Sequence, residues 1–222
     1  MTDSLLTIFI GWDEREQEAY EVCVKSLYEN TDSVLNIIPI KKHELIKAGK
    51  YNRENDQAAT DFAYTRFLVP YLCDFKGWAL FIDCDFLFTK DVKELFDYAD
   101  DKHSLMCVQH DYVPKASIKM DGQPQVAYPR KNWSSCVLWN CGHKHNRILT
   151  PYTVNTQTGA YLHRFKFTTD WAIGELPLEW NWLEGEYEKP DTPPAAIHFT
   201  NGGPWFENCQ DVDYADLWRS YL

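Results

Sequence analysis

The sequence predicts an α/β protein with a mixed, mostly parallel sheet flanked by helices, and three observations support this fold class. Apolar, β-rich runs alternate with segments whose apolar residues recur at helical spacing through the first half of the chain. The length of 222 residues suits a single domain over 1–222, and a hydrophobic content of 45% is enough for a core.

No run of about 18 apolar residues is present that would span a bilayer as a transmembrane segment. The start, "MTDSLLTIFIGWDE", lacks the basic region of a signal peptide, so a cytoplasmic location is expected.

Four strands and four helices are expected in the first 110 residues. The first apolar run ends at Gly11, and Tyr20, Val24 and Leu27 follow it at helical spacing. Strands that alternate with helices favour a parallel sheet with helices on both faces. The expected strands are 5–12, 33–40, 78–83 and 104–109, and the expected helices are 13–31, 41–49, 61–74 and 91–99.

The second half of the chain is more irregular. The stretch 115–128 suggests a hairpin around Asp121 and Gly122, because an Asp-Gly pair suits a tight turn. A strand is expected at 133–140, and a helix at 145–159 that ends at Gly159. No internal repeat, low-complexity segment or Pro/Gly-rich linker divides the chain.

Charge and cysteine content exclude several classes of protein. The formal net charge of −11 argues against nucleic-acid binding and against anionic lipid, because both are bound mainly through their phosphates. A ligand that carries phosphate would therefore need a cation between it and the protein. Seven cysteines are an odd number in a chain without an export signal, so reduced thiols are expected.

The stretch "WALFIDCDFLF" places Asp83 and Asp85 at the end of an apolar strand. Residues i and i+2 of a strand project from the same face about 7 Å apart, so both carboxylates can approach one cation while Cys84 points the other way. Open α/β sheets bind ligands beyond the carboxyl ends of their strands. The pattern therefore predicts a site for Mg²⁺ or Mn²⁺ and a phosphate-bearing ligand.

A second Asp-x-Asp, at 211–213, has the same spacing but follows no apolar strand. There we expect Asp211 to cap the last helix of the chain.

Five stretches, in order along the chain, resemble the GT-A glycosyltransferases, especially the small retaining galactosyltransferase and glycogenin-like group (glycosyltransferase family 8-like). The two specific ones are "ALFIDCDFLFTKDVKELF", which is similar to the Asp-x-Asp segment, and "AAIHFTNGGPW", which resembles the His-Phe-Thr-Gly...Pro-Trp close. The other three are "LTIFIGWDEREQEAYEVCVKSL", "FAYTRFLVPYL" and "WSSCVLWN". Together they cover most of the chain.

The resemblance implies a single GT-A domain in which 1–110 binds a nucleotide sugar and 111–222 binds an acceptor. It implies that Asp83, Asp85 and His198 bind Mn²⁺ or Mg²⁺, and that Asp170 and Arg66 lie near the reacting sugar. The cofactor-binding residues that it implies are Gly11, Trp12, Asp13, Glu14, Arg66, Asp83, Cys84, Asp85, Gly202 and Gly203.

Four of these assignments have a structural alternative. A histidine after "AAI" is more often a core residue, and Arg66 suits a surface ion pair. The loop 11–14 suits an ordinary turn, and Asp170 suits a helix cap.

The chain also departs from the family pattern. Gly203 stands where the family usually has a Lys that touches the diphosphate, so neutralisation would rest on the metal and Arg66. In "TTDWAIGELPLEWNWL" only Asp170 of an Asp-Gln-Asp stretch is present, and Ser134 and Cys136 replace an Asn and a Gly.

The function that we predict is a metal-dependent transfer of a hexose from a nucleotide sugar, most simply UDP-glucose or UDP-galactose, to an unknown hydroxyl or glycan acceptor. The resemblance implies retention of the anomeric configuration. A metal-dependent nucleotidyltransferase or phosphohydrolase is an alternative, but "GWDEREQE" is acidic where that class has a Gly-rich basic loop. A sugar-binding protein without catalysis is another, because the nine tryptophans could stack on sugars.

Two clusters in the second half have weaker interpretations. Trp171, Trp180, Trp182 and Trp205 could form an acceptor platform, although core packing suits at least two of them. The residues Cys136, Cys141, His143 and His145 lie close in sequence but match no common zinc spacing, so a strand end and a polar turn are expected there.

Overall fold

The computed structural model describes residues 5–54, 58–112 and 129–222, with a six-stranded main sheet and a three-stranded second sheet. The predicted hairpin around Asp121 and Gly122 lies outside the described residues. The strands of the main sheet, in spatial order, are β2 (Leu35–Ile40), β1 (Leu6–Gly11), β3 (Trp78–Ile82), β6 (Cys136–Asn140), β5 (Leu105–Cys107) and β7 (Ile173–Glu175).

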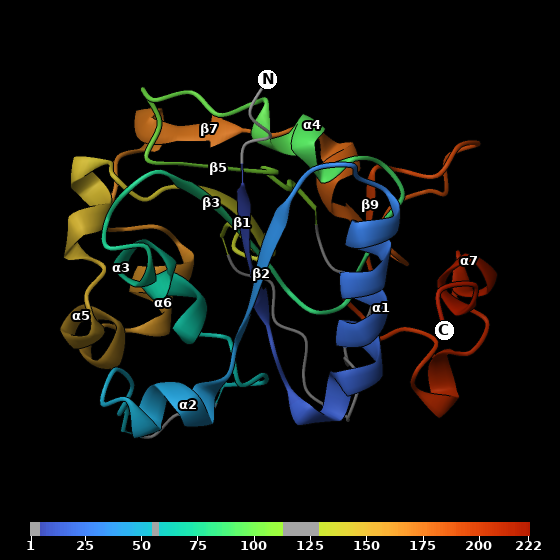
Figure 1. Ribbon diagram of the computed structural model, residues 1–222, viewed down its shortest axis with the longest axis horizontal. Helices are drawn as coiled ribbons and strands as arrows, with labels where there is room; N and C mark the ends of the chain where they lie inside the picture. Colours follow the sequence, from blue (N-terminus) through green and yellow to red (C-terminus); the bar gives the residue numbers. More distant parts are fainter. Residues whose placement is uncertain (1–4, 55–57, 113–128) are drawn as a thin grey trace.

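The main sheet confirms the predicted fold class. β1 pairs in parallel with β2 and β3, and β5 pairs in parallel with β7, whereas β6 runs antiparallel to both of its neighbours. Helix α1 (Gln17–Glu29) lies on one side of the sheet, and α3 (Val69–Leu72), α5 (Pro151–Thr156) and α6 (Gly159–His163) lie on the other (Figure 1). One continuous hydrophobic core links strands from both halves of the chain.

The second sheet has the order β4 (Phe86–Phe88), β9 (Ala196–His198) and β8 (Trp182–Leu183). β4 follows β3 after only three residues, so the chain passes directly from the main sheet into the second one. β4 lies against α1, and Phe88 N of this strand donates to the Ser26 hydroxyl of that helix at 3.0 Å. The segment 83–85 therefore lies where the two sheets meet.

The remaining helices are short. They are η1 (Glu14–Glu16), α2 (Lys42–Lys47), η2 (Thr65–Leu68), α4 (Val92–Phe96), η4 (Lys144–Ile148), η5 (Asp170–Ala172), η6 (Leu178–Asn181), η7 (Glu207–Cys209) and α7 (Ala215–Arg219). Among the residues that the structure describes, no helix combines the length and the apolar character needed to cross a bilayer.

Two predicted helices, 61–74 and 145–159, are wrong in detail. The segment 61–74 forms η2 and a single α-helical turn, α3, that begins around Pro70, because proline suits the first turn of a helix but not its interior. The segment 145–159 is divided by Pro151, which begins α5 after its N-cap Thr150. Gly159 begins α6 and does not end a helix, because Thr158 provides a new N-cap.

The last helix begins later than predicted. α7 starts at Ala215, and its N-cap is Tyr214 in the left-handed conformation at φ 62°, with no side-chain cap. Asp211 is therefore not the cap of this helix.

Candidate metal site and adjoining pocket

The side chains of Asp83, Asp85 and His198 meet at the carboxyl edge of the main sheet. Each offers one ligand atom, and these atoms all lie within 4.8 Å of one another. Asp83 follows β3, and Asp85 precedes β4, whose Phe86 pairs with His198 of β9. The strand register therefore brings the distant His198 to the two aspartates. Two carboxylates and an imidazole are a donor set that suits Mn²⁺ or Mg²⁺.

His198 is held by contacts on three sides. Its ring stacks on Phe86 with centroids 4.4 Å apart, and only 2% of the residue is exposed. Its Nε2 lies 3.3 Å from Asp85 Oδ2, and its Nδ1 lies 2.8 Å from Asn181 Oδ1. His198 is thus a buried residue with a satisfied hydrogen bond, and it also directs one ring nitrogen towards the aspartates.

Arg66 lies beneath Asp83. Its Nη1 is 2.7 Å from Asp83 Oδ1, and the two side chains are only 7% and 14% exposed. The same guanidinium donates to the carbonyl oxygens of Ser134, at 2.9 Å, and of Phe62, at 3.2 Å. The pair is therefore not a surface ion pair, and Arg66 orients the first aspartate through a bond to its carboxylate.

Cys84 points away from the two aspartates, as the strand geometry predicts. Its thiol is fully buried and donates to Glu16 Oε2 at 3.5 Å. Burial, together with the nearby charge of Asp85, raises the pKa of Glu16 to about 8. At neutral pH Glu16 is therefore mostly protonated, which reduces the negative charge behind the candidate metal site.

The loop 11–14 lies at the same edge of the sheet, because Ile10 of β1 pairs with Ile82 of β3. Gly11 is needed for packing, since a Cβ there would lie 2.4 Å from the Phe62 ring. Trp12 Nε1 donates to Gln17, Lys41 Nζ lies 4.9 Å above the Trp12 ring, and Glu14 is exposed. The role of these residues in binding a base and ribose remains a prediction.

Asp13 is committed to contacts within the protein. Arg15 binds it through Nε at 2.9 Å and Nη2 at 2.7 Å, and the backbone N–H of Asp61 also donates to it. Burial alone would raise the pKa of Asp13, but these hydrogen bonds outweigh burial and lower it. Asp13 thus holds the loop at 61 against the end of β1.

The glycine pair follows β9. Gly202 has φ 103°, a conformation that favours glycine, and its N–H donates to Phe199 O at 2.8 Å. A Cβ on Gly203 would lie 2.0 Å from the Trp205 ring, so close packing of that indole accounts for this glycine. Contacts of the pair with phosphate remain a prediction.

The structure does not bring Asp170 to the three candidate ligands. Its side chain is 87% exposed and lies 2.6 Å from Arg130 Nη2, whose hydrogen bond lowers the pKa of Asp170. Thr169, and not Asp170, is the N-cap of η5. A catalytic role for Asp170 therefore has no support from its position and remains a prediction.

The four tryptophans do not form one surface. Trp180 and Trp182 are buried, Trp205 packs edge-on against Phe199, and Trp171 is 67% exposed beside His145. Core packing thus accounts for the first two.

The Cys and His residues at 136–145 likewise lie in different surroundings. Cys136 and Cys141 are buried, whereas the rings of His143 and His145 lie 4.6 Å apart at η4. All seven cysteines are free.

A polar pocket of about 270 Å³ adjoins Asp83 and Arg66. Three small side chains and several hydroxyl, amide and imidazole groups line it: Ala58, Ala59, Thr60, Ala63, Tyr64, Arg66, Asp83, Asn132, Ser134, Ser135 and His163. Burial, with Arg66 and Arg53 nearby, lowers the pKa of His163 to about 3, so this imidazole is neutral. Its Nδ1 lies 2.9 Å from the Ser134 hydroxyl.

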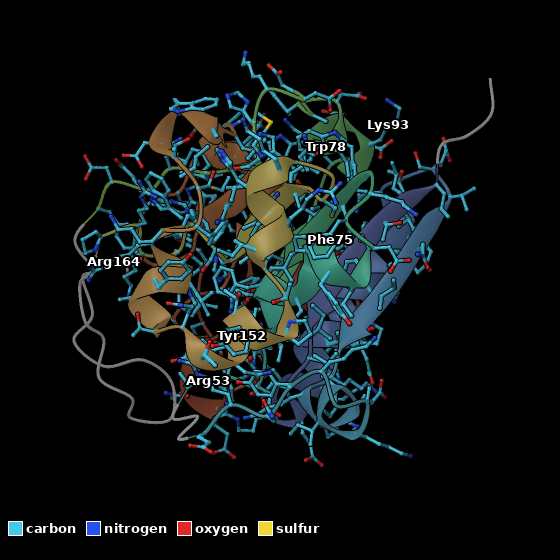
Figure 2. All side chains as sticks on the ribbon, turned by 90° about the vertical axis from the view of Figure 1, so that its left-hand side faces the viewer. Arg53, Phe75, Trp78, Lys93, Tyr152 and Arg164 are labelled. Carbon is cyan, nitrogen blue, oxygen red and sulfur yellow. The ribbon has the colours of Figure 1, made fainter. Side chains whose placement is uncertain are left out.

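Arg53 supports one wall of this pocket. Its guanidinium lies 3.9 Å from the ring centroid of Tyr64, and its Nη1 donates to the carbonyl oxygens of Val154 and Gln157 at 2.9 and 2.7 Å. Figure 2 shows Arg53 near Tyr152, a residue of α5, the helix that also carries Val154. Tyr64 is thereby fixed between α5 and the pocket.

Several site residues were not identified from the sequence. Asn181, Ser135 and Asn132 lie behind His198, and His163 and Tyr64 lie in the pocket. Ser135 lies in "WSSCVLWN" and Tyr64 lies in "FAYTRFLVPYL", two of the stretches that resemble the family, whereas no sequence pattern singled out Asn132, His163 or Asn181.

Comparisons with known proteins bear on the family and the fold of the chain. No protein-family model matches the sequence. The chain is 53% identical to Protein CDI of Arabidopsis thaliana over 220 residues, which cover 97% of this chain and 85% of that protein. It is 28% identical to the probable glycosyl transferase Gly of Streptococcus gordonii over 181 residues, which cover 73% of this chain and 24% of that protein.

Among solved structures, the galactosyltransferase LgtC, in complex with donor and acceptor sugar analogs, superimposes with a TM-score of 0.57 at 13% identity. The superposition covers 97% of this chain and 95% of LgtC, so the two share a fold over nearly their whole lengths. The chain therefore belongs to the family of the Arabidopsis Protein CDI, and its fold is that of the GT-A glycosyltransferases.

Proposed function

We propose that this protein is a metal-dependent glycosyltransferase that moves a hexose from a nucleotide sugar, most simply a UDP-hexose, to a hydroxyl acceptor with retention. The observation that carries the proposal is the convergence of Asp83, Asp85 and His198 beside a polar pocket. Two similar proteins support it, because Gly is named as a probable glycosyl transferase and LgtC as a galactosyltransferase.

The three candidate ligands fit a divalent cation in number and chemistry. Mn²⁺ or Mg²⁺ bound there would supply Lewis-acid stabilisation of the leaving diphosphate. In an acidic protein, such an ion is also the simplest way to accept a diphosphate. Arg66 would hold Asp83 in place, because its Nη1 lies 2.7 Å from the carboxylate.

The pocket beside Asp83 would hold the sugar. Its alanines leave room for a ring, and its hydroxyl, amide and neutral imidazole groups can exchange hydrogen bonds with sugar hydroxyls. An inverting enzyme would need a carboxylate base opposite the leaving group, whereas a retaining enzyme uses same-face attack or a covalent intermediate. We propose retention, the course implied by the resemblance to the glycogenin-like group.

The site draws on both predicted halves of the chain. Residues 1–110 supply Asp83, Asp85 and Arg66, while 111–222 supply His198 and the pocket residues Ser134 and His163. We propose that 1–110 provides most of the nucleotide contacts, with the loop 11–14 near the base and ribose. The acceptor would then approach over 111–222.

A nucleotide-release assay tests the proposal. Purified protein would be incubated with Mn²⁺ or Mg²⁺ and a panel of UDP-, GDP- and ADP-sugars, with a chelator as control. We expect metal-dependent release from one donor that is lost in Asp83→Asn and Asp85→Asn and retained in the matched variants Asp211→Asn and Asp213→Asn. With an acceptor in hand, the anomeric configuration of the product would test retention.

The other outcomes identify the alternatives. Binding of a nucleotide sugar by calorimetry without release would favour a sugar-nucleotide-binding protein. Formation of a nucleotide sugar from a nucleoside triphosphate and a sugar phosphate would favour a nucleotidyltransferase. Neither binding nor release with any donor would overturn the proposal.

A further inference from the structure

Behind His198 lies a hydrogen-bonded chain of three residues. Asn181 is fully buried and its Oδ1 lies 2.8 Å from His198 Nδ1. On its other side, Asn181 Nδ2 lies 3.0 Å from the Ser135 hydroxyl and 3.4 Å from the Asn132 carbonyl oxygen. The Ser135 hydroxyl donates in turn to that same carbonyl at 2.7 Å.

These contacts determine which way the Asn181 amide faces. A backbone carbonyl oxygen can only accept hydrogen bonds, so an amide oxygen of Asn181 placed 3.4 Å from the Asn132 carbonyl would repel it, whereas the NH₂ group can donate to it. Ser135 uses its one proton on that carbonyl, and its oxygen can therefore accept from Asn181. The Asn132 carbonyl oxygen and the Ser135 hydroxyl oxygen both act as acceptors, so the NH₂ group of Asn181 faces them. The amide oxygen of Asn181 must then face His198.

The orientation of Asn181 determines the proton on His198. An amide oxygen can only accept, so His198 Nδ1 must carry a proton and donate it. In the neutral imidazole the other nitrogen, Nε2, is then unprotonated and has its lone pair available. Nε2 is the atom that lies 3.3 Å from Asp85 Oδ2, on the side of the candidate ligands.

We infer that Asn181 is a positioning residue for the metal site, which holds His198 in the tautomer whose Nε2 can bind a divalent cation. The inference rests on the proposed function in one respect only, namely that a cation binds at Asp83, Asp85 and His198. Outer partners of this kind, which fix the tautomer and orientation of a ligating histidine, are a common requirement of metal sites.

The chain also links the two sheets. Asp83 N donates to Ser135 O at 2.9 Å at the end of the main sheet, whereas Asn181 directly precedes β8 of the second sheet. The bond between Asn181 and Ser135 therefore connects the strand ends that carry Asp83 to those that carry His198. A loss of this bond would change the spacing of the ligands as well as the tautomer.

The tautomer can be measured without metal and without any assay of activity. ¹⁵N-resolved NMR of the imidazole nitrogens distinguishes the two neutral tautomers, and the spectra would be recorded at increasing pH until the His198 signals no longer change. The His198 signals would be assigned by their loss in His198→Gln. We expect a proton on Nδ1 in the native protein. We expect the same in Asn181→Asp, whose carboxylate accepts from Nδ1 while the Ser135 hydroxyl turns from the Asn132 carbonyl to donate to the second carboxylate oxygen. We expect a mixture of tautomers in Asn181→Leu.

Mn²⁺ titration of the same variants, followed by the electron paramagnetic resonance signal of free Mn²⁺, gives the second readout. Asn181→Leu should raise the Kd by about 10- to 100-fold, and Asn181→Asp should restore most of the affinity. The matched control is Asn146→Leu. Asn146 is equally buried and its Nδ2 donates to the carbonyls of Ser104 and Asn140, away from the site, so its loss should leave the His198 tautomer and the Kd unchanged.

Two results would overturn the inference: a native His198 with its proton on Nε2, or an Asn181→Leu protein with unchanged tautomer and unchanged Mn²⁺ affinity. If Asn181→Leu does not fold, Ser135→Ala replaces it, and an unchanged His198 spectrum in that variant would also count against the chain. A native protein that binds no Mn²⁺ would instead overturn the proposed metal site, because the tautomer is measured in its absence.

Discussion

The two Asp-x-Asp stretches of this chain have the same spacing but opposite surroundings. Asp83 and Asp85 are 14% and 13% exposed, and they face Arg66 and His198. Asp211 is exposed in the turn before α7, and Asp213 forms a half-exposed pair with Lys189 at 3.2 Å. In Figure 1, α7 lies apart from the main sheet, on the outer side of α1.

The difference teaches that spacing alone does not make a site. The first stretch follows a buried strand, so neighbouring strands bring a histidine, an arginine and a polar pocket to the same point. The second follows a turn, and its partner is a lysine within reach of solvent. Each stretch also has a buried glutamate beside it, Glu16 in the first and Glu184 in the second.

The largest expected difference concerns the ion pairs. Arg66→Met should lower the free energy of unfolding by about 3 kcal/mol, because it removes the buried cation beside Asp83 and the side-chain donor to the Ser134 carbonyl oxygen. Lys189→Met should cost less than about 1 kcal/mol, because that pair is exposed to solvent. Urea denaturation of both variants measures the difference, and equal losses would contradict the contrast between the two stretches.

Metal affinity should separate the stretches next. Asp85→Asn should raise the Kd for Mn²⁺ by at least about 100-fold, since even residues behind a ligand contribute about 10- to 100-fold. Asp213→Asn should leave the Kd unchanged, because Lys189 already pairs with Asp213. Isothermal titration calorimetry with Mn²⁺ on the two variants provides the measurement. An effect of Asp213→Asn as large as that of Asp85→Asn would place the metal elsewhere.

The buried glutamates provide a comparison in pH. The folded-state pKa of Glu16 is raised to about 8 from 4.5, so its contribution to stability is fully present below about pH 4.5 and is lost as the pH rises to about 8. Glu16→Gln stays neutral, and it should gain more than about 1.4 kcal/mol over the native protein across that range, the equivalent of one pKa unit.

Glu184 is the control for this experiment. Burial also raises the pKa of Glu184, but the N–H of Asp213 donates to its carboxylate and opposes the shift. Glu184→Gln should therefore reduce the pH dependence of the free energy of unfolding by less than Glu16→Gln does. Unfolding free energies measured at several pH values would refute this explanation if the two variants behaved alike.

Much of the main sheet could be predicted from the sequence because its strands are locally encoded. The apolar runs that end at Gly11, Ile40 and Asp83 each correspond to an observed strand. Helix lengths were less predictable, because 61–74 has apolar residues at helical spacing although Pro70 divides it into two short turns. The same limit applied at Pro151 and at Gly159, where helices begin that periodicity had joined into one.

Only the part of the candidate site that is encoded by local sequence, or that resembles a known family, could be predicted. Asp83 and Asp85 follow from the strand that precedes them, and His198 followed from the resemblance to a known family. No local pattern indicates Asn181, because its contact with His198 depends on the pairing of β8 with β9. Asp170 shows the converse, since a residue suggested by resemblance lies exposed beside Arg130.

The smallest expected effect concerns Asp211, which the sequence suggested as a helix cap. A lost N-cap costs about 1 kcal/mol, whereas an exposed substitution changes stability by less than about 0.5 kcal/mol. Asp211→Ala should fall in the second class, because α7 begins at Ala215 without a side-chain cap. Asp91→Ala is the matched comparison, since Asp91 accepts from Lys93 N at 2.8 Å as the N-cap of α4 and should lose about 1 kcal/mol. If thermal unfolding gave Asp211→Ala the larger loss, the second Asp-x-Asp would have a structural role that the turn before α7 does not explain.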